Sequence, residues 1–204
     1  MNFLAHIYLS GTNDHMKLGN FIGDYVKGKK YLYFPGDIQR GILLHRKIDE
    51  FTDNSPIPKE IKTLFLPYYK KYAGIVIDLF YDHFLARNWE NYCEVPLEDF
   101  VSDFYDILMD NYVHLPRRVK NFLPNMIENN RLYSYKHLKG LEYALGIMSR
   151  YTSLPDQTEN AIYTLNLYYE DIHQNFQEFF QSVMYYVERH QGVDLPVLTG
   201  QLKR

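Results

Sequence analysis

Residues 157–190 decide the fold class, and they read QTENAIYTLNLYYEDIHQNFQEFFQSVMYYVERH. Their apolar side chains recur at steps of three and four residues, which places them along one stripe of an amphipathic helix. The stripe consists of Ile162, Leu165, Tyr169, Ile172, Phe176, Phe179, Val183 and Val187. Residues typical of a helix start, Ser153-Leu154-Pro155-Asp156, precede it. The pattern therefore predicts one long helix.

The same periodicity continues through the rest of the chain, and no segment of useful length shows the two-residue alternation of a strand. The sequence predicts an all-α protein with a single compact multi-helix domain over residues 1–204, because no repeat, low-complexity tract or linker divides it. Further helices are expected near 16–27, 37–53, 59–71, 73–92, 97–112, 116–130 and 135–151.

Composition limits the classes of function. With 46% apolar and 17% aromatic residues, the chain is a globular protein and not a disordered one. A net charge of −3 gives no general attraction for nucleic acid, so an acidic partner would need a local basic patch. Cys93 is alone, which excludes an internal disulfide and fits a reducing cytoplasm. No signal peptide or membrane span is expected, and the oligomeric state stays open.

Polar residues interrupt apolar helices in four segments of the first half. They are Asn2 to His6, Gly19 to Asp24, His45 to Asp53 and Asp78 to His83. On a helix, His45 and Asp49 lie one turn apart on the same side. Asp82 and His83 lie about 100° apart, which still lets both reach an ion held between neighbouring helices.

Imidazole nitrogen with carboxylate oxygen is a ligand mixture that suits Mn, Fe, Zn or Mg. Such a site lowers the pKa of a bound water and supplies a hydroxide nucleophile near neutral pH. This chemistry is hydrolysis, and phosphate esters are the natural substrates because Arg46, Lys47 or Lys27 would hold the remaining charge.

Each of these candidate site residues also has a purely structural interpretation. His6 alone fits a hydrogen-bonded core or surface histidine, and His45 with Asp49 fits a solvated ion-paired helix face. Asp24 fits a turn cap or a partner of Lys27, and Trp89 fits the core. Several buried carboxylates without a cation are costly, however, and this favours a metal for the whole set.

Four stretches together resemble the acyl carrier protein phosphodiesterase family, in its expected order and approximate spacing. They are MNFLAHIYLS, GNFIGDYVKG, GILLHRKIDEFTDNSP and YDHFLARNW. The resemblance continues more loosely through 116–119 and 146–150. It implies an all-helical domain distantly similar to HD-type metal-dependent phosphohydrolases, with the order of the metal-binding elements permuted and the His-Asp doublet reversed.

By that correspondence the implied metal ligands are Asp24, His45, Asp82 and His83. The implied reaction is hydrolysis of the phosphodiester between 4′-phosphopantetheine and a serine of holo-acyl carrier protein, with a divalent ion, typically Mn²⁺, and with Fe²⁺, Mg²⁺ or Zn²⁺ as other candidates.

Catalytic roles are assigned around that metal. His6, Asn20 or Asp49 would orient the attacking water or protonate the leaving serine oxygen, and Arg46 would neutralise the phosphoryl group. Arg46 has an equally good structural role as an ion-pair partner of Glu50.

Carrier proteins of this class are strongly acidic, so a basic docking surface is expected. Two runs offer one, and each also fits a solvated surface run: Lys27, Lys29 and Lys30 in the first, and Arg117 and Arg118, with Lys120 nearby, in the second.

Two other functions remain open from the sequence. The same site could act on a nucleotide or another small phosphoester, or the chain could be a helical module that binds the carrier without turnover. A panel of phosphodiesters separates the first from the family reaction, and metal analysis of the purified protein separates the second.

Overall fold

The computed structural model describes residues 1–196 as helices joined by short connections, with no strand among them. The all-α prediction is confirmed. The α-helices are α1 (Phe3–Tyr8), α2 (Asp14–Ile22), α3 (Gly36–Asn54), α4 (Ile57–Tyr69), α5 (Ala73–Arg87), α6 (Leu97–Asp110), α7 (Arg117–Glu128), α8 (Arg131–Ser134), α9 (Leu138–Tyr151), α10 (Thr158–Leu167) and α11 (Tyr169–Gln191). The 3₁₀ turns are η1 (Gly23–Tyr25), η2 (Gly28–Tyr33), η3 (Lys70–Tyr72), η4 (Trp89–Asn91) and η5 (Tyr112–His114). No helix in the described part of the chain is long and apolar enough to cross a membrane.

The single long helix predicted over 157–190 is wrong, because Tyr168 divides it into α10 and α11. Tyr168 leaves the helical region, with φ −114° and ψ 28°. Its N–H still bonds Thr164 O and its carbonyl accepts from Ile172 N, so the break costs few hydrogen bonds. The bend lets α10 pack on α4 and α9 while α11 packs on α3, α4 and α5.

Two other predicted helices are too long. The helix expected to 27 ends at Ile22 and passes into η1, and the one expected to 92 ends at Arg87. The short helices α1 and α8 were not predicted, because six and four residues are too few to show a period.

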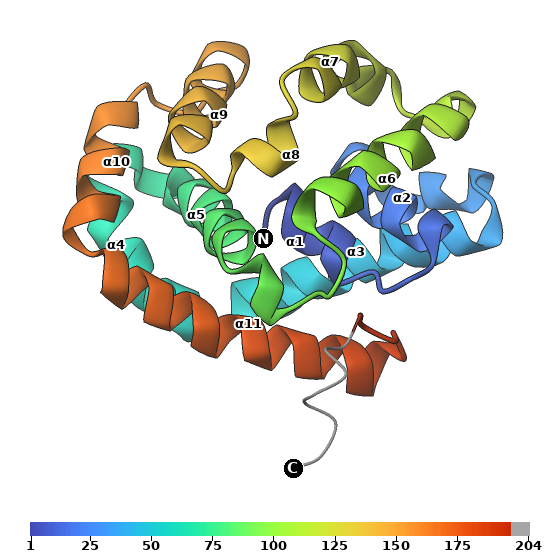
Figure 1. The fold of residues 1–204 in the computed structure, drawn as a ribbon, viewed down its shortest axis with the longest axis horizontal. Helices are drawn as coiled ribbons and strands as arrows, with labels where there is room; N and C mark the ends of the chain where they lie inside the picture. Colours follow the sequence, from blue (N-terminus) through green and yellow to red (C-terminus); the bar gives the residue numbers. More distant parts are fainter. Residues whose placement is uncertain (197–204) are drawn as a thin grey trace.

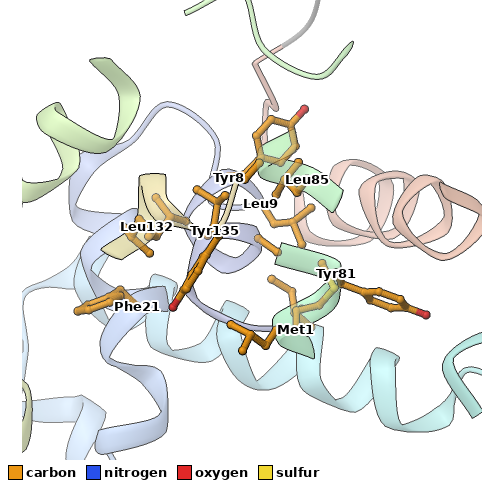
Figure 2. Packing of buried hydrophobic residues seen from close by; sticks show 14 of the residues in the cluster. Met1, Tyr8, Leu9, Phe21, Tyr81, Leu85, Leu132 and Tyr135 are labelled. Carbon is orange, nitrogen blue, oxygen red and sulfur yellow. The ribbon is translucent and has the colours of Figure 1, made fainter. Parts of the chain in front are cut away.

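Helix α5 forms the centre of the molecule. Eleven of its fifteen residues are buried, and it packs against α1, α4, α9 and α11. Figure 1 shows α1 and the N-terminus beside α5 in the middle of the fold, with α11 running along one side. Close by, Tyr8, Phe21, Tyr81 and Tyr135 bring α1, α2, α5 and the end of α8 into one core (Figure 2).

Two glycines let α2 and α3 touch backbone to backbone. A Cβ on Gly19 would lie 2.2 Å from Ile38 O, and one on Gly41 would lie 2.3 Å from Met16 O. These helices carry Asn20 and His45, so the close contact sets the distance between polar side chains of two separate segments.

We therefore predict that Gly41→Ala destabilises the protein by about 1–3 kcal/mol, because the new methyl group must push the two backbones apart. Urea unfolding followed by circular dichroism measures this. Gly146→Ala is the matched control: no atom lies within 4 Å of a Cβ there, and it should stabilise α9 by about 0.5–1 kcal/mol. Equal effects of the two substitutions would disprove the close-contact explanation.

Candidate metal centre

Helix α1 is held against α5 from its N-terminal end. Asp82 Oδ2 accepts a hydrogen bond from Leu4 N at 2.8 Å, and Oδ1 accepts one from Ala5 N at 3.1 Å. These are two of the N–H groups that a helix start leaves without a partner, and Asn2 makes no capping bond of its own. The Met1 amino group lies 3.0 Å from Asp78 Oδ1, one turn earlier on α5. These contacts fix the position of His6.

His6 is buried and held in one tautomer. Its Nδ1 lies 2.7 Å from Asn20 Oδ1. The Asn20 amide nitrogen donates to His6 O and to Ser10 Oγ, each at 2.9 Å, so its oxygen must face the ring. An acceptor at Nδ1 places the proton there and leaves the Nε2 lone pair free.

Helix α3 brings His45 and Asp49 to the same place. Asp49 Oδ1 lies 3.4 Å from His6 Nε2, and Oδ2 lies 3.1 Å from His45 Nε2. The two imidazole rings stack with centroids 4.2 Å apart. Gly23 makes room for this arrangement, because a Cβ there would lie 2.3 Å from His45 Cγ.

His6, His45 and Asp49 form a cluster in which the side chains affect one another's pKa values. Burial and the neighbouring His45 lower the pKa of His6 to about 4, so His6 is neutral. Burial opposes protonation of His45, but contacts with Asp24 and Asp49 raise its pKa to about 9. Burial would raise the pKa of Asp49, yet its contact with the protonated ring of His45 holds it well below the usual range.

The atoms fit a divalent cation. One ligand atom from each of His6, His45 and Asp49 can be chosen so that all lie within 4.8 Å of one another. Ligands about 2.1 Å from an ion lie roughly 3–4 Å apart, so small movements complete such a site. His6 Nε2 and His45 Nε2 are buried without a well-formed hydrogen bond. The His6 lone pair is available to a ligand, and His45 Nε2 becomes available once its ring is deprotonated.

Asp24 lies at the edge of this cluster, with Oδ1 3.6 Å from His45 Nε2. Its side chain is 64% exposed and also pairs with Lys27 at 3.8 Å. Of the four ligands predicted from the sequence, the structure thus brings Asp24 and His45 together, beside His6 and Asp49, for which the sequence predicted catalytic roles.

Asp82 and His83 lie differently. Both Asp82 oxygens bond the start of α1, and burial, opposed by those two bonds, raises the pKa of Asp82 to about 7. His83 Nδ1 lies 2.7 Å from Tyr135 O, and its Nε2 lies 3.0 Å from Tyr169 Oη. Burial lowers the pKa of His83 to about 4. Both ring nitrogens of His83 are therefore used in joining α5 to α8 and α11.

Arg46 supports the loop after α2. Its Nη2 donates to Val26 O and Gly28 O, each at 2.8 Å, and its guanidinium lies 5.3 Å from the Tyr31 ring centroid. Glu50 pairs with Lys47 at 2.9 Å, so the Arg46–Glu50 pair considered from the sequence is not the one observed. Trp89 is 1% exposed, in agreement with its expected core role.

The two predicted basic runs both lie near η1, the turn that carries Asp24. Lys27, Lys29 and Lys30 are exposed directly after Asp24. Arg117 and Arg118 are exposed in the first turn of α7, which reaches η1 through a ring contact of 5.8 Å between Phe122 and Tyr25. Arg118 is close enough to Tyr25 to affect its pKa.

Two hollows of the surface, with volumes of about 470 and 590 Å³, contain none of the cluster residues. The first lies beside Tyr8 and Tyr92, and the second lies between α9 and α10. The cluster reaches the surface instead at Asp24 and Asp49, whose side chains are 64% and 42% exposed.

The chain was compared with known protein families, curated proteins and solved structures. The family described as acyl carrier protein phosphodiesterase matches residues 1–183. A protein of that name from Yersinia pestis is 29% identical over 187 residues, and one from Enterobacter sp. (strain 638) is 32% identical over 189. One from Salmonella paratyphi A is 29% identical over 185 residues. Each alignment covers 90% of this chain and 96% of the relative. No solved structure matches the chain.

The contacts of Asp82 lead to a prediction about stability. Asp82→Ala leaves two buried N–H groups without a partner and should cost about 2 kcal/mol or more, while Asp82→Asn keeps one acceptor and should cost less. Thermal unfolding of both variants and of the wild type, in EDTA, gives the comparison. If Asp82→Ala is as stable as the wild type without metal, Asp82 does not anchor α1.

Proposed function

Because the chain belongs to the acyl carrier protein phosphodiesterase family, we propose that it hydrolyses the phosphodiester that joins 4′-phosphopantetheine to a serine of acyl carrier protein. The products are the apo-carrier and free 4′-phosphopantetheine. The observation that carries this proposal is the buried pair His6 and His45 facing Asp49, a donor set suited to a divalent ion.

His6, His45 and Asp49 would hold the ion, with Asp24 as a further ligand at the exposed edge. Asp82 and His83, assigned as ligands from the sequence, take supporting roles in this proposal because their polar atoms bond α1, Tyr135 and Tyr169. A divalent cation bound here would neutralise phosphoryl oxygens and lower the pKa of the attacking water. Mn²⁺ is the first ion to test, ahead of Fe²⁺, Mg²⁺ and Zn²⁺.

The protein's own groups prepare the site. Asn20 fixes the tautomer of His6 and so acts as a positioning residue. The raised pKa of His45 favours a proton on its Nε2, which faces Asp24 and Asp49, and this proton would have to leave before the nitrogen could ligate. Arg46 holds the loop that carries the basic residues.

The basic edge supports a protein substrate. Lys27, Lys29, Lys30, Arg117 and Arg118 are exposed around Asp24 and Tyr25, where they would face an acidic carrier. The open position of Asp24 and Asp49 allows a prosthetic group to approach while its carrier stays outside.

Metal binding can be tested without turnover. We predict that Mn²⁺ raises the melting temperature of the wild-type protein, and that His6→Ala, His45→Ala and Asp49→Ala each weaken Mn²⁺ binding by at least about a hundredfold, since loss of an outer-shell partner alone costs up to that much. Calorimetric titration measures the affinity. His15→Ala, at an exposed histidine of α2, is the control and should bind as the wild type does. Unchanged affinity in all three variants would place the ion elsewhere.

Substrate choice is tested by mass spectrometry of holo-acyl carrier protein incubated with enzyme and Mn²⁺. The apo-carrier should accumulate, and small phosphodiesters and nucleotides should react more slowly. The Lys29→Glu/Lys30→Glu double variant should raise KM for the carrier about tenfold, more so at low salt, with kcat little changed. Lys139→Glu, on the exposed face of α9, is the matched control. Faster hydrolysis of a nucleotide than of the carrier would reject the proposed substrate.

A further inference from the structure

Arg131, the first residue of α8, is a buried cation without a paired anion. It is 8% exposed, and its Nε has no hydrogen-bond partner. Within residues 1–196, no carboxylate oxygen lies within 4.0 Å of its guanidinium. A buried charge of this kind is costly to the fold unless an anion compensates it.

Two more donors lie beside Arg131 in the same condition. The Tyr135 hydroxyl and the Asn2 amide nitrogen are buried, and neither makes a well-formed hydrogen bond. Burial raises the pKa of Tyr135, while hydrogen-bonding contacts of Arg131 and Asn2 with its hydroxyl oppose that effect. The hydroxyl oxygen can accept from its two neighbours, but the donors of this group outnumber its acceptors, and an acceptor-rich anion would satisfy the rest.

Backbone contacts fix the place of this group in the fold. Leu132 N donates to Tyr105 Oη at 3.1 Å, and Tyr135 O lies 2.7 Å from His83 Nδ1. Gly140 lets α9 approach α8, since a Cβ there would lie 2.0 Å from Ser134 O. Figure 2 shows Tyr135 extending from α8 toward the N-terminal segment, with Leu132 and Phe21 beside it.

These donors lie next to the candidate metal centre. Asn2 directly precedes α1, and its carbonyl accepts from His6 N at 3.2 Å. The Tyr25 hydroxyl is influenced by Asp24, which contacts His45, and also by Arg131 and Tyr135. Asn2 thus adjoins the helix that carries His6, and Arg131 and Tyr135 lie within electrostatic range of Tyr25 in the turn that carries Asp24.

We propose that Arg131, with Tyr135 and Asn2, binds the non-bridging phosphoryl oxygens of the substrate phosphodiester. This inference rests on the proposed function. The guanidinium offers a planar pair of N–H groups that match two phosphate oxygens. It takes the phosphate-binding role predicted for Arg46, whose Nη2 is occupied by two backbone carbonyls.

Phosphate binding is measured first, without metal and without turnover. The probes are inorganic phosphate and 4′-phosphopantetheine, titrated calorimetrically into EDTA-treated protein. Arg131→Met should weaken the binding of both about ten- to hundredfold, and Arg131→Lys should weaken it less, because the charge remains and the paired geometry is lost. Tyr135→Phe should weaken it severalfold. Arg150→Met, at an exposed arginine in the last turn of α9, should bind as the wild type does.

The results separate this site from the proposed reaction, because turnover of holo-acyl carrier protein is measured in parallel. Phosphate binding that depends on Arg131 in a protein that does not cleave the carrier supports the phosphate site and rejects the substrate. Turnover with unchanged kcat and unchanged phosphate affinity in Arg131→Met overturns the phosphate site and leaves the reaction standing. If Arg131→Met fails to fold, Tyr135→Phe decides, and wild-type affinity there overturns the inference.

Discussion

Two hydrogen bonds from Leu4 N and Ala5 N to the carboxylate of Asp82 join the first helix to the central helix, and the position of His6 depends on them. Helix α1 has six residues and no side-chain cap of its own, so it is too short to be stable alone. Asp82 supplies from α5 the acceptors that this helix start lacks. These hydrogen bonds to α1 explain why the carboxylate of Asp82 lies inside an apolar helix.

The candidate site combines this anchor with the contact between α2 and α3. Asn20 and Asp24 belong to one chain segment, and His45 and Asp49 to the next, with Gly19, Gly23 and Gly41 allowing their backbones and rings to meet. His6 completes the group from a third segment. Its lone pair faces Asp49 because Asn20 leaves only one tautomer. The ligand atoms are thus prepared by backbone packing and by one amide.

Periodicity was sufficient to predict the fold class, because the apolar stripe of almost every long helix is visible in the sequence. It could not predict the break at Tyr168, since the stripe continues through it without proline or glycine. The one-turn spacing of His45 and Asp49 also predicted their shared face correctly. Asp82 and His83 are adjacent, and their spacing alone could not tell that one bonds α1 while the other bonds Tyr135 and Tyr169. Arg131 lies in a four-residue helix, and only tertiary packing reveals its burial.

The most direct test of the account is anomalous diffraction from crystals of the protein grown with Mn²⁺. We expect an anomalous peak within ligand distance of His6 Nε2, His45 Nε2 and Asp49, with the Asp82 carboxylate still bonded to Leu4 N and Ala5 N. A peak between Asp82 and His83, or a Mn²⁺ site that leaves His6 unliganded, would contradict it.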